Sequence, residues 1–404
     1  MCNGCETKHK KNRPRCVEHK KNRPRCVTRC VNCERLVRFR RDLHRIPELD
    51  RDLPETTKYI KKVLEPLPCE IVPAGDAGFC AFFKADGKDG TIAFRTDMDA
   101  LPITEAGEAD YASVHEGCMH ACGHDGHMSI LLGFAEDVSR RLDKLPKNVL
   151  LIFQAAEETT GGASDICDTG VLSRFNVEKV YGLHLWPDQP KGVIVSRRGE
   201  FMASASVITV KITGKSTHIG KYKQGIDAME AAAEFLKRVY DMEAAAFPPD
   251  IFRLLRFGVL RSGDANNVVP GWAVLEGALR AFSIEVFDRL WEKTLEAADE
   301  IESGTGAKFE LTRTKPYPPL INPDRLYDRA KEVLTEAGFT FKGLDEPLMM
   351  SEDFSSYQAV RPGLFMHLGT GTGTPLHWGG YIMDESVLPM GVDIFMTLLE
   401  SEEC

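Results

Sequence analysis

Hydrophobic residues recur along this chain with two periods, one of about 3.6 residues and one of about two, and each period predicts a local structure. Up to residue 200, the helical period predicts amphipathic helices at residues 36–43, 56–64 and 129–141. Short and almost wholly apolar runs predict buried strands at residues 69–72, 80–83, 91–95, 148–156 and 180–185. Because helices and strands alternate along the chain, we expect an α/β fold with helices on both faces of a sheet.

The pattern changes near Phe201. Residues 206–213 (SVITVKIT) alternate between apolar and polar side chains, which predicts a half-buried strand. Further elements are predicted downstream, namely helices at 227–242 and 287–304 and strands at 252–259 and 274–282. Two successive strand–helix–strand units predict a small α+β domain of about 105 residues. Since the pattern returns to mixed α/β after Lys308, we expect this domain to be inserted into the larger one.

Length and composition narrow the class of protein. At 404 residues the chain exceeds what one hydrophobic core usually organises, so two domains are expected. Hydrophobic residues at 43% and charged residues at 27% are ordinary for a globular protein. No apolar run approaches the roughly 20 residues that cross a bilayer, and the N-terminus lacks the apolar stretch of a secretory signal. We therefore expect a cytoplasmic protein without a membrane partner.

Charge and cysteine are concentrated at the start of the chain. Residues 1–41 carry 14 Lys and Arg against 3 acidic residues, whereas the rest carries 37 against 57. An acidic body disfavours nucleic-acid binding, which depends on neutralising phosphates. In the head, residues 1–33, the sequence HKKNRPRCV occurs twice between two Cys-x-x-Cys pairs. These pairs suit a structural zinc, but their 24-residue spacer is longer than usual, and the composition favours a disordered basic tail.

Residues 120–128 (HACGHDGHM) gather three histidines, a cysteine and an aspartate. Gly123 separates Cys122 from His124 and would let both side chains converge from a tight loop. Thiolate and imidazole are good ligands for zinc and similar divalent ions. Taken alone, the stretch fits a hydrogen-bonded turn equally well.

Further candidates for a metal site lie at the ends of apolar runs, within one such run, or after a glycine-rich stretch. They are Asp97, Asp99, Glu157, Glu158, His184 and His377. Two adjacent carboxylates, Glu157 and Glu158, are costly after an apolar strand unless they are exposed or coordinated. A lone histidine in an apolar run, as at His184, is usually a hydrogen-bonded core residue. Asp97 and Asp99 could each accept a hydrogen bond from the ring of a metal-binding histidine and so orient it. Because sites on α/β sheets lie beyond the carboxyl ends of the strands, the joint placement of these residues favours a metal site.

Nine motifs occur in the order found in the M20 metallopeptidase superfamily, namely RRDLHRIPEL, RTDMDALP, MHACGHDGHM, FQAAEET, GLHLW, GKSTHIG, ANNVVP, SEDFSSY and PLHWG. Over about residues 34–400 the chain resembles the amidohydrolase branch, which includes N-acyl-amino-acid, hippurate and auxin-conjugate hydrolases and N-acetyl-diaminopimelate deacetylases. The combination of HACGHDGH with the paired glutamates is highly specific to this superfamily. The resemblance implies a mixed-sheet, di-metal catalytic domain, residues 34–200 and 308–404. It also implies an inserted smaller α+β lid and dimerisation domain, residues 201–307, and hence a homodimer.

The resemblance also implies the site residues. Two divalent metal ions per subunit (Zn, Mn, Co or Ni) are implied. Cys122 would bridge or bind them, and His124, Glu158, His184 and His377 would complete the ligand set. Glu157 matches the family's general base, which acts on a metal-activated water. His218 matches a lid histidine that stabilises the oxyanion, in related enzymes from the partner subunit, and Asn267 matches a lid residue near the substrate. Arg280 is a candidate for the substrate carboxylate, with a structural ion pair as the alternative.

Two segments depart from the family pattern. Ile219 and Gly220 follow His218 where Ala-Ala-x-Pro is common, and Trp378 follows His377 where a small residue and proline are common. Both segments should face the substrate. We expect an amidohydrolase that removes the acyl group from N-acyl amino acids, with a metallo-exopeptidase acting on dipeptides as the alternative. A third interpretation, an inactive binding protein, is disfavoured by the complete set of ligands.

Overall fold

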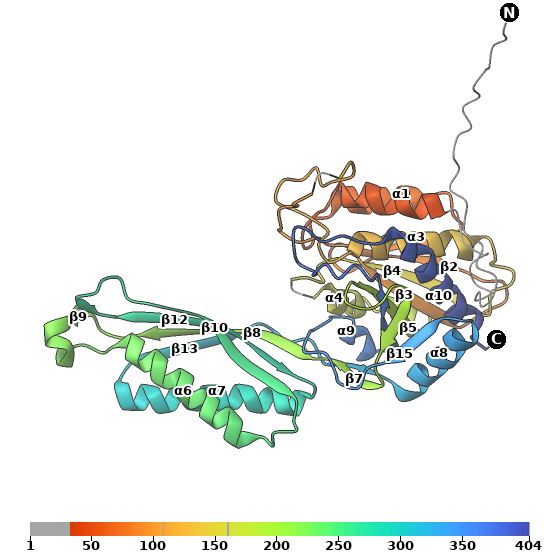
Figure 1. Cartoon of the computed structure of the whole chain (residues 1–404). Coiled ribbons are helices and arrows are strands. Elements are labelled where there is room, and N and C mark those ends of the chain that lie inside the picture. Colours follow the sequence, from red (N-terminus) through yellow and green to blue (C-terminus); the bar gives the residue numbers. More distant parts are fainter. Residues whose placement is uncertain (1–32, 108, 160, 404) are drawn as a thin grey trace, which may run out of the picture.

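The computed structural model describes residues 33–107, 109–159 and 161–403 (Figure 1). The basic Cys-rich head up to residue 32 lies outside the described residues, and with it the hypotheses of a zinc site or a disordered tail. In the described part of the chain, no helix combines the length and the apolar character that crossing a membrane requires.

A mixed eight-stranded sheet forms the centre of the larger lobe, with strand order β1-β2-β4-β3-β5-β16-β6-β15. Its strands are β1 (Glu70–Ala74), β2 (Gly78–Phe83), β3 (Thr91–Asp97), β4 (Asn148–Gln154), β5 (Val177–Trp186), β6 (Val193–Ser196), β15 (Thr340–Gly343) and β16 (Gly363–Gly369). β4, β3, β5 and β16 are mutually parallel. β2 pairs antiparallel with β4, and β1 pairs antiparallel with β2. Every residue of β3, β4 and β16 is buried, which explains why these strands are continuous apolar runs in the sequence.

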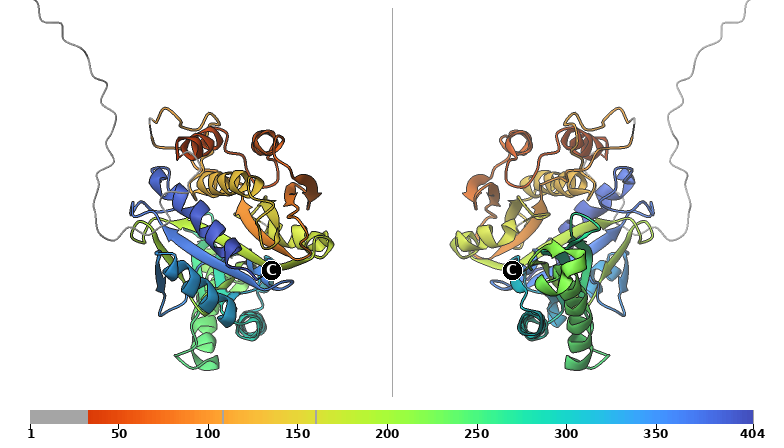
Figure 2. Two further views of the ribbon diagram at one scale, coloured as in Figure 1. Left: turned by 90° about the vertical axis from the view of Figure 1, so that its right-hand side faces the viewer. Right: turned by 90° about the vertical axis from the view of Figure 1, so that its left-hand side faces the viewer.

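Helices cover both faces of this sheet, as the alternation of elements predicts. On one side of the sheet lie α1 (Cys33–His44), α2 (Pro54–Leu64), α3 (His124–Ser139), α8 (Asp324–Glu336) and α10 (Leu388–Glu400). The other face packs against α4 (Gly162–Asp168), α5 (Val171–Arg174) and α9 (Ser355–Gln358). Figures 1 and 2 show α1 (red) lying over α3 (yellow), so that α3 is enclosed between α1 and the sheet.

The smaller lobe projects from the larger one in Figure 1 and has its own hydrophobic core. Its antiparallel sheet has the order β10-β12-β8-β13, made of β8 (Ser204–Thr213), β10 (Arg253–Ser262), β12 (Trp272–Ala281) and β13 (Lys308–Arg313). Two long helices, α6 (Ala228–Ala246) and α7 (Ile284–Thr305), pack on this sheet. β8 alternates between buried and more exposed residues, as its sequence predicts.

The structure differs from the sequence-based expectation at two boundaries. α3 begins at His124, five residues before the predicted start, because Gly123 takes a left-handed conformation (φ 84°) directly before the first turn. His124 therefore lies on a helix and not in a loop. β13 pairs with β8 beyond residue 307, where we expected the larger domain to resume. The alternating strand at 308–313 completes the small sheet, so we place the end of the inserted unit after Arg313.

Candidate metal centre

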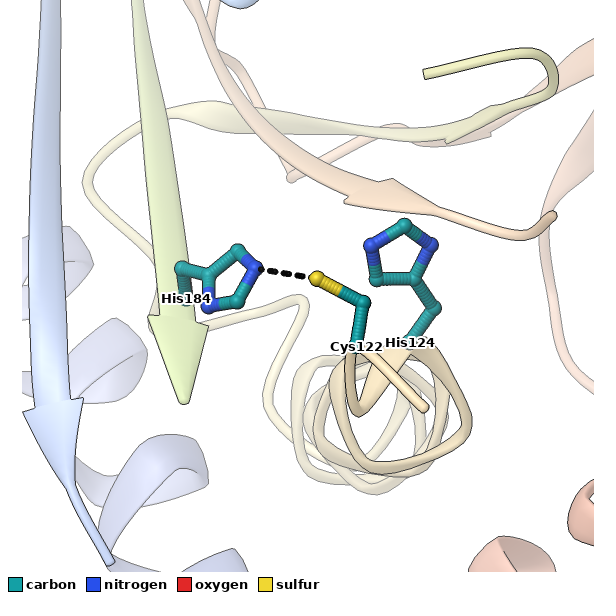
Figure 3. A group of neighbouring side chains, drawn as sticks. All are labelled: Cys122, His124 and His184. Carbon is teal, nitrogen blue, oxygen red and sulfur yellow. Dashed lines mark hydrogen bonds between the residues drawn. The ribbon is translucent and has the colours of Figure 1, made fainter. Parts of the chain in front are cut away.

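The predicted ligands come from segments that end at one edge of the large sheet. β3, β4 and β5 are parallel neighbours, so their carboxyl ends meet there, beside the first turn of α3. Figure 3 shows Cys122 and His124 pointing from the start of α3 toward the same region as His184 of β5. Glu158 follows β4, and His377 reaches the cluster from the chain after β16.

The distances bring all five predicted ligands together. Cys122 Sγ lies 3.4 Å from His184 Nε2 and 3.4 Å from His377 Nε2. Glu158 Oε1 lies 3.2 Å from His377 Nε2 and 3.8 Å from His124 Nε2. Two triples of ligand atoms, each within 4.8 Å, share Cys122: one includes His124 and His184, and the other includes Glu158 and His377. A further triple joins His124 and Glu158 to Glu157. A shared thiolate between two triples is an arrangement that suits two neighbouring cations.

Unpartnered polar atoms support this fit. Among the described residues, no group forms a hydrogen bond of acceptable geometry with His124 Nε2 or Glu158 Oε1, although both atoms are buried. A buried polar atom without a partner is costly, and a coordinated cation would remove that cost. Thiolate, imidazole and carboxylate together suit zinc and also accept manganese, cobalt or nickel. The residues present therefore fit divalent metal ions.

Burial and the neighbouring carboxylates shift the pKa values of Cys122 and His124. Burial, together with the nearby Glu158 and Glu157 carboxylates, raises the pKa of the Cys122 thiol. Burial opposes protonation of His124, but Asp97, Asp99 and Glu158 outweigh it and raise the pKa of His124 to about 10. Ligands must be deprotonated to bind a metal, so metal affinity at this site should fall as the pH is lowered.

Backbone carbonyls orient the ligand histidines. His124 Nδ1–H donates to Asp99 O, and His184 Nδ1–H donates to Leu185 O, each at 2.8 Å. Both bonds leave Nε2 free to face the cluster, which is the usual way in which a metal-binding histidine is held.

Asp99 also fixes the two glutamates. Its Oδ1 accepts the backbone N–H of Glu157 at 3.1 Å, and its Oδ2 accepts that of Glu158 at 3.0 Å. Ala156, directly before them, has a positive φ of 56°. One buried aspartate thus holds the turn that carries the candidate base and a candidate ligand.

Asp97 contacts a histidine to which the sequence assigned no role. His127 Nδ1–H donates to Asp97 Oδ1 at 2.7 Å, and His127 Nε2 accepts the Leu185 N–H at 2.9 Å. The candidate ligand His124 is farther from Asp97, with 3.8 Å between His124 Nδ1 and Asp97 Oδ1. Asp97 therefore supports the site through His127, which packs against the His184 ring.

A buried ion network behind the site was missed in the sequence. Arg95 donates to Asp97 Oδ2 and Asp353 Oδ1, each at 2.8 Å, and lies 3.1 Å from Glu352 Oε1. Removing one partner from such a buried pair typically costs about 3–5 kcal/mol. Burial raises the pKa of Glu157, and the neighbouring Glu352 raises it further. The signals available were an arginine within an apolar strand and the acidic pair in SEDFSSY, but neither identified its partners.

The structure does not bring the lid candidates His218 and Asn267 to the cluster of the same chain. His218 ends β9 (Thr217–His218), which pairs with β11 (Val268–Val269) at the far end of the smaller lobe (Figure 1). Asn267 lies beside it, because its carbonyl accepts the Ile219 N–H at 2.9 Å. Both side chains are exposed.

Arg280 lies elsewhere, on β12 near the larger lobe, where Nη1 donates to Met349 O. Burial lowers the pKa of Arg280, and no carboxylate within the described residues forms an ion pair with it. The structural ion pair that the sequence left open is therefore absent from the described part of the chain.

Comparisons with known proteins agree with this geometry. The model of Peptidase family M20/M25/M40 matches residues 93–401. An uncharacterized hydrolase of Staphylococcus aureus (strain USA300) is 33% identical over 370 residues, which cover 90% of this chain and 96% of that protein. The crystal structure of the Bacillus subtilis YXEP protein, a dinuclear metal binding peptidase from the M20 family, is 32% identical. It has a TM-score of 0.78 and covers 91% of this chain and 97% of its own. The aminobenzoyl-glutamate utilization protein of Klebsiella pneumoniae shares the fold, at 21% identity and a TM-score of 0.67, covering 91% of this chain and 97% of its own.

Proposed function

This chain belongs to peptidase family M20/M25/M40 and is a metal-dependent hydrolase, and from that premise we propose that it cleaves the amide bond of N-acyl amino acids. One observation carries the proposal: five ligand candidates converge on a shared thiolate, with the separate carboxylate of Glu157 beside them. Two metal ions are supported by the two overlapping triples and by the dinuclear Bacillus subtilis neighbour.

In the proposed reaction the metal site activates the amide and the water, and Glu157 transfers the proton. Cys122, His124, Glu158, His184 and His377 would hold two divalent ions, which when bound polarise the amide carbonyl and acidify water. The Glu157 carboxylate lies within 4.8 Å of the ligand atoms of His124 and Glu158, and as the base it would accept the proton of the attacking water. The same carboxyl group then returns that proton to the leaving nitrogen. Its raised pKa, caused by burial and by Glu352, suits a group that must both accept and donate a proton.

The amino-acid portion of the substrate would meet Arg280. Its guanidinium forms no ion pair within the described residues, and it lies next to the loop that contains Met349. An arginine without a carboxylate partner is well suited to bind the free carboxylate of an amino acid. Trp378 is 52% exposed beside His377 and would contact the acyl group, for which an exposed indole offers a large apolar surface.

The proposal is tested by metal-dependent hydrolysis. The full chain is stripped of metal, reloaded with Mn, Zn, Co or Ni, and offered N-acetyl, N-benzoyl and long-acyl amino acids beside dipeptides. We expect release of the free amino acid from one or more acylated substrates and none from the metal-free protein. Turnover of dipeptides alone would contradict the proposal and favour an exopeptidase.

His218 is expected to act on the site of a partner subunit. The tip of the smaller lobe carries His218 away from the metal ligands of its own chain, which supports a homodimer in which the histidine donates to the oxyanion in trans. His218→Ala should lower kcat about 10²- to 10³-fold, as loss of one oxyanion donor does elsewhere, without changing metal content. Steady-state kinetics and metal analysis measure both quantities.

A subunit-mixing experiment separates action in trans from action within one chain. Co-expressed His218→Ala and Glu157→Gln subunits would form heterodimers in which one site has both an intact base and an intact histidine. If the histidine acts in trans, activity should recover to about a quarter of wild type, because half of the dimers are mixed and half of their sites are complete. No recovery, despite mixed dimers, would show that the histidine serves its own chain.

A further inference from the structure

Two segments of the chain connect the larger and the smaller lobe, and hydrogen bonds join these two crossings to each other. The first crossing joins β7 (Gly199–Met202) to β8, and the second runs from Arg313 to β14 (Leu320–Asn322). β7 and β14 pair antiparallel, with Met202 opposite Leu320. Ser204 Oγ donates to Tyr317 O in the second crossing, and Ser206 Oγ donates to Thr314 O at 2.6 Å. Movement of the smaller lobe must therefore act on both crossings together.

The Tyr317 side chain leaves this crossing and contacts the loop that follows β4. Its hydroxyl donates to Thr159 O at 3.1 Å. Its ring packs on Gly161, which has φ 82°, and a Cβ atom on this glycine would lie 2.3 Å from Tyr317 Cε1. Only glycine satisfies both the backbone conformation and the close approach of the ring. The contact between the Tyr317 ring and the loop therefore depends both on the tyrosine in the second crossing and on Gly161 in the loop.

The contacted loop also carries Glu157 and Glu158. Two aspartates outside the strands also hold this loop. The Asp99 carboxylate accepts the Glu157 and Glu158 N–H groups, and Asp353 Oδ2 accepts the Ala163 N–H at 3.0 Å. The loop also closes on itself, because the Gly161 and Gly162 N–H groups donate to Ala156 O at 3.0 and 3.1 Å. Tyr317 therefore reaches a hydrogen-bonded loop from the lobe crossing.

We propose that Tyr317 is a positioning residue that couples the crossing between the lobes to the loop carrying the base Glu157. A rotation of the smaller lobe about the crossing moves the Tyr317 backbone, and the ring and hydroxyl transmit this movement to Thr159 and Gly161. The position of the Glu157 carboxylate then depends on the orientation of the lobe that covers the substrate. The inference rests on the proposed function for the role of Glu157, but the physical coupling can be measured without activity.

The first test is hydrogen exchange of the metal-free, full-length protein. Tyr317→Phe keeps the ring on Gly161 and removes only the bond to Thr159 O, so we expect the peptide that covers residues 156–163 to exchange about three- to tenfold faster. Tyr59→Phe is the matched control. It removes a hydroxyl of α2 that donates to Asp42 Oδ2 of α1 at 2.8 Å, and it should leave residues 156–163 unchanged.

The second variant perturbs the crossing without touching the loop. Ser204→Ala removes the bond to Tyr317 O, and we expect it also to speed exchange at residues 156–163, by a smaller factor. Unchanged exchange in this peptide for either variant would overturn the coupling, even if the protein proved inactive on every substrate.

Kinetics supply the functional measurement once a substrate is known. Tyr317→Phe should lower kcat about five- to tenfold with KM and metal content within twofold of wild type, because it displaces the base and leaves the binding groups in place. Unaltered kcat, or an equal change in the Tyr59→Phe control, would contradict a positioning role.

Discussion

Glu157→Gln is expected to lower kcat by about 10²- to 10⁴-fold, the range that positioned acid–base catalysis usually contributes, while both metal ions remain bound. Glutamine keeps the shape of the side chain and its backbone bond to Asp99 Oδ1, but it cannot accept a proton. The two triples that share Cys122 do not contain Glu157, so the metal content should stay at the wild-type value. Steady-state kinetics on the best substrate of the panel, with metal analysis of the same sample, measure both quantities.

Glu178→Gln is a suitable control for this variant. Glu178 is a partly exposed carboxylate on β5 that pairs with Lys147 at 2.9 Å, and its loss should leave kcat unchanged. Near-normal turnover by Glu157→Gln would remove Glu157 from the role of general base. Loss of metal together with turnover would instead assign the residue to the ligand set.

Cys122→Ala is expected to abolish turnover by removing metal, and it should affect both ions. Cys122 Sγ belongs to both ligand triples, whereas His124, His184, Glu158 and His377 each complete only one of these two. We expect a loss of more than about a hundredfold in metal affinity, which exceeds the roughly 10- to 100-fold that loss of an outer contact to a ligand typically costs. Isothermal titration of the metal-free protein with Zn or Mn gives the number of ions and their affinities.

His184→Ala and Cys118→Ala complete the comparison. His184→Ala removes a member of one triple, so one ion should be lost in preference to the other. Cys118 is a partly exposed cysteine four residues before the site and belongs to no candidate ligand group among the described residues, so Cys118→Ala should bind metal normally. Two ions bound to Cys122→Ala with wild-type affinity would refute a shared thiolate.

The local pattern predicted strands β1–β5, β8, β10 and β12 and helices α1, α2, α3, α6 and α7, but it missed the other strands and helices of the described chain. A motif of nine residues was sufficient to nominate Cys122 and His124. The network behind the site was not predictable in this way. Arg95 and Asp353 are 258 positions apart, and their pairing depends on how the last part of the chain returns to the sheet. The same holds for Tyr317, whose hydroxyl bonds a carbonyl 158 positions earlier.

The hydrophobic period, the paired glutamates and the histidine-rich motif thus predicted, from sequence alone, an α/β sheet with candidate metal ligands at the carboxyl ends of its strands. Those features are local, because side-chain period and ligand chemistry are properties of neighbouring residues. The family resemblance had already implied that Cys122 bridges or binds the metals. Only the tertiary structure decided that Asp99 holds the two glutamates and that Tyr317 joins the lobe crossing to their loop. Such contacts form when parallel strands and the two crossings bring distant segments to the same edge. Their geometry is therefore a property of the packed chain and not of any single stretch of it.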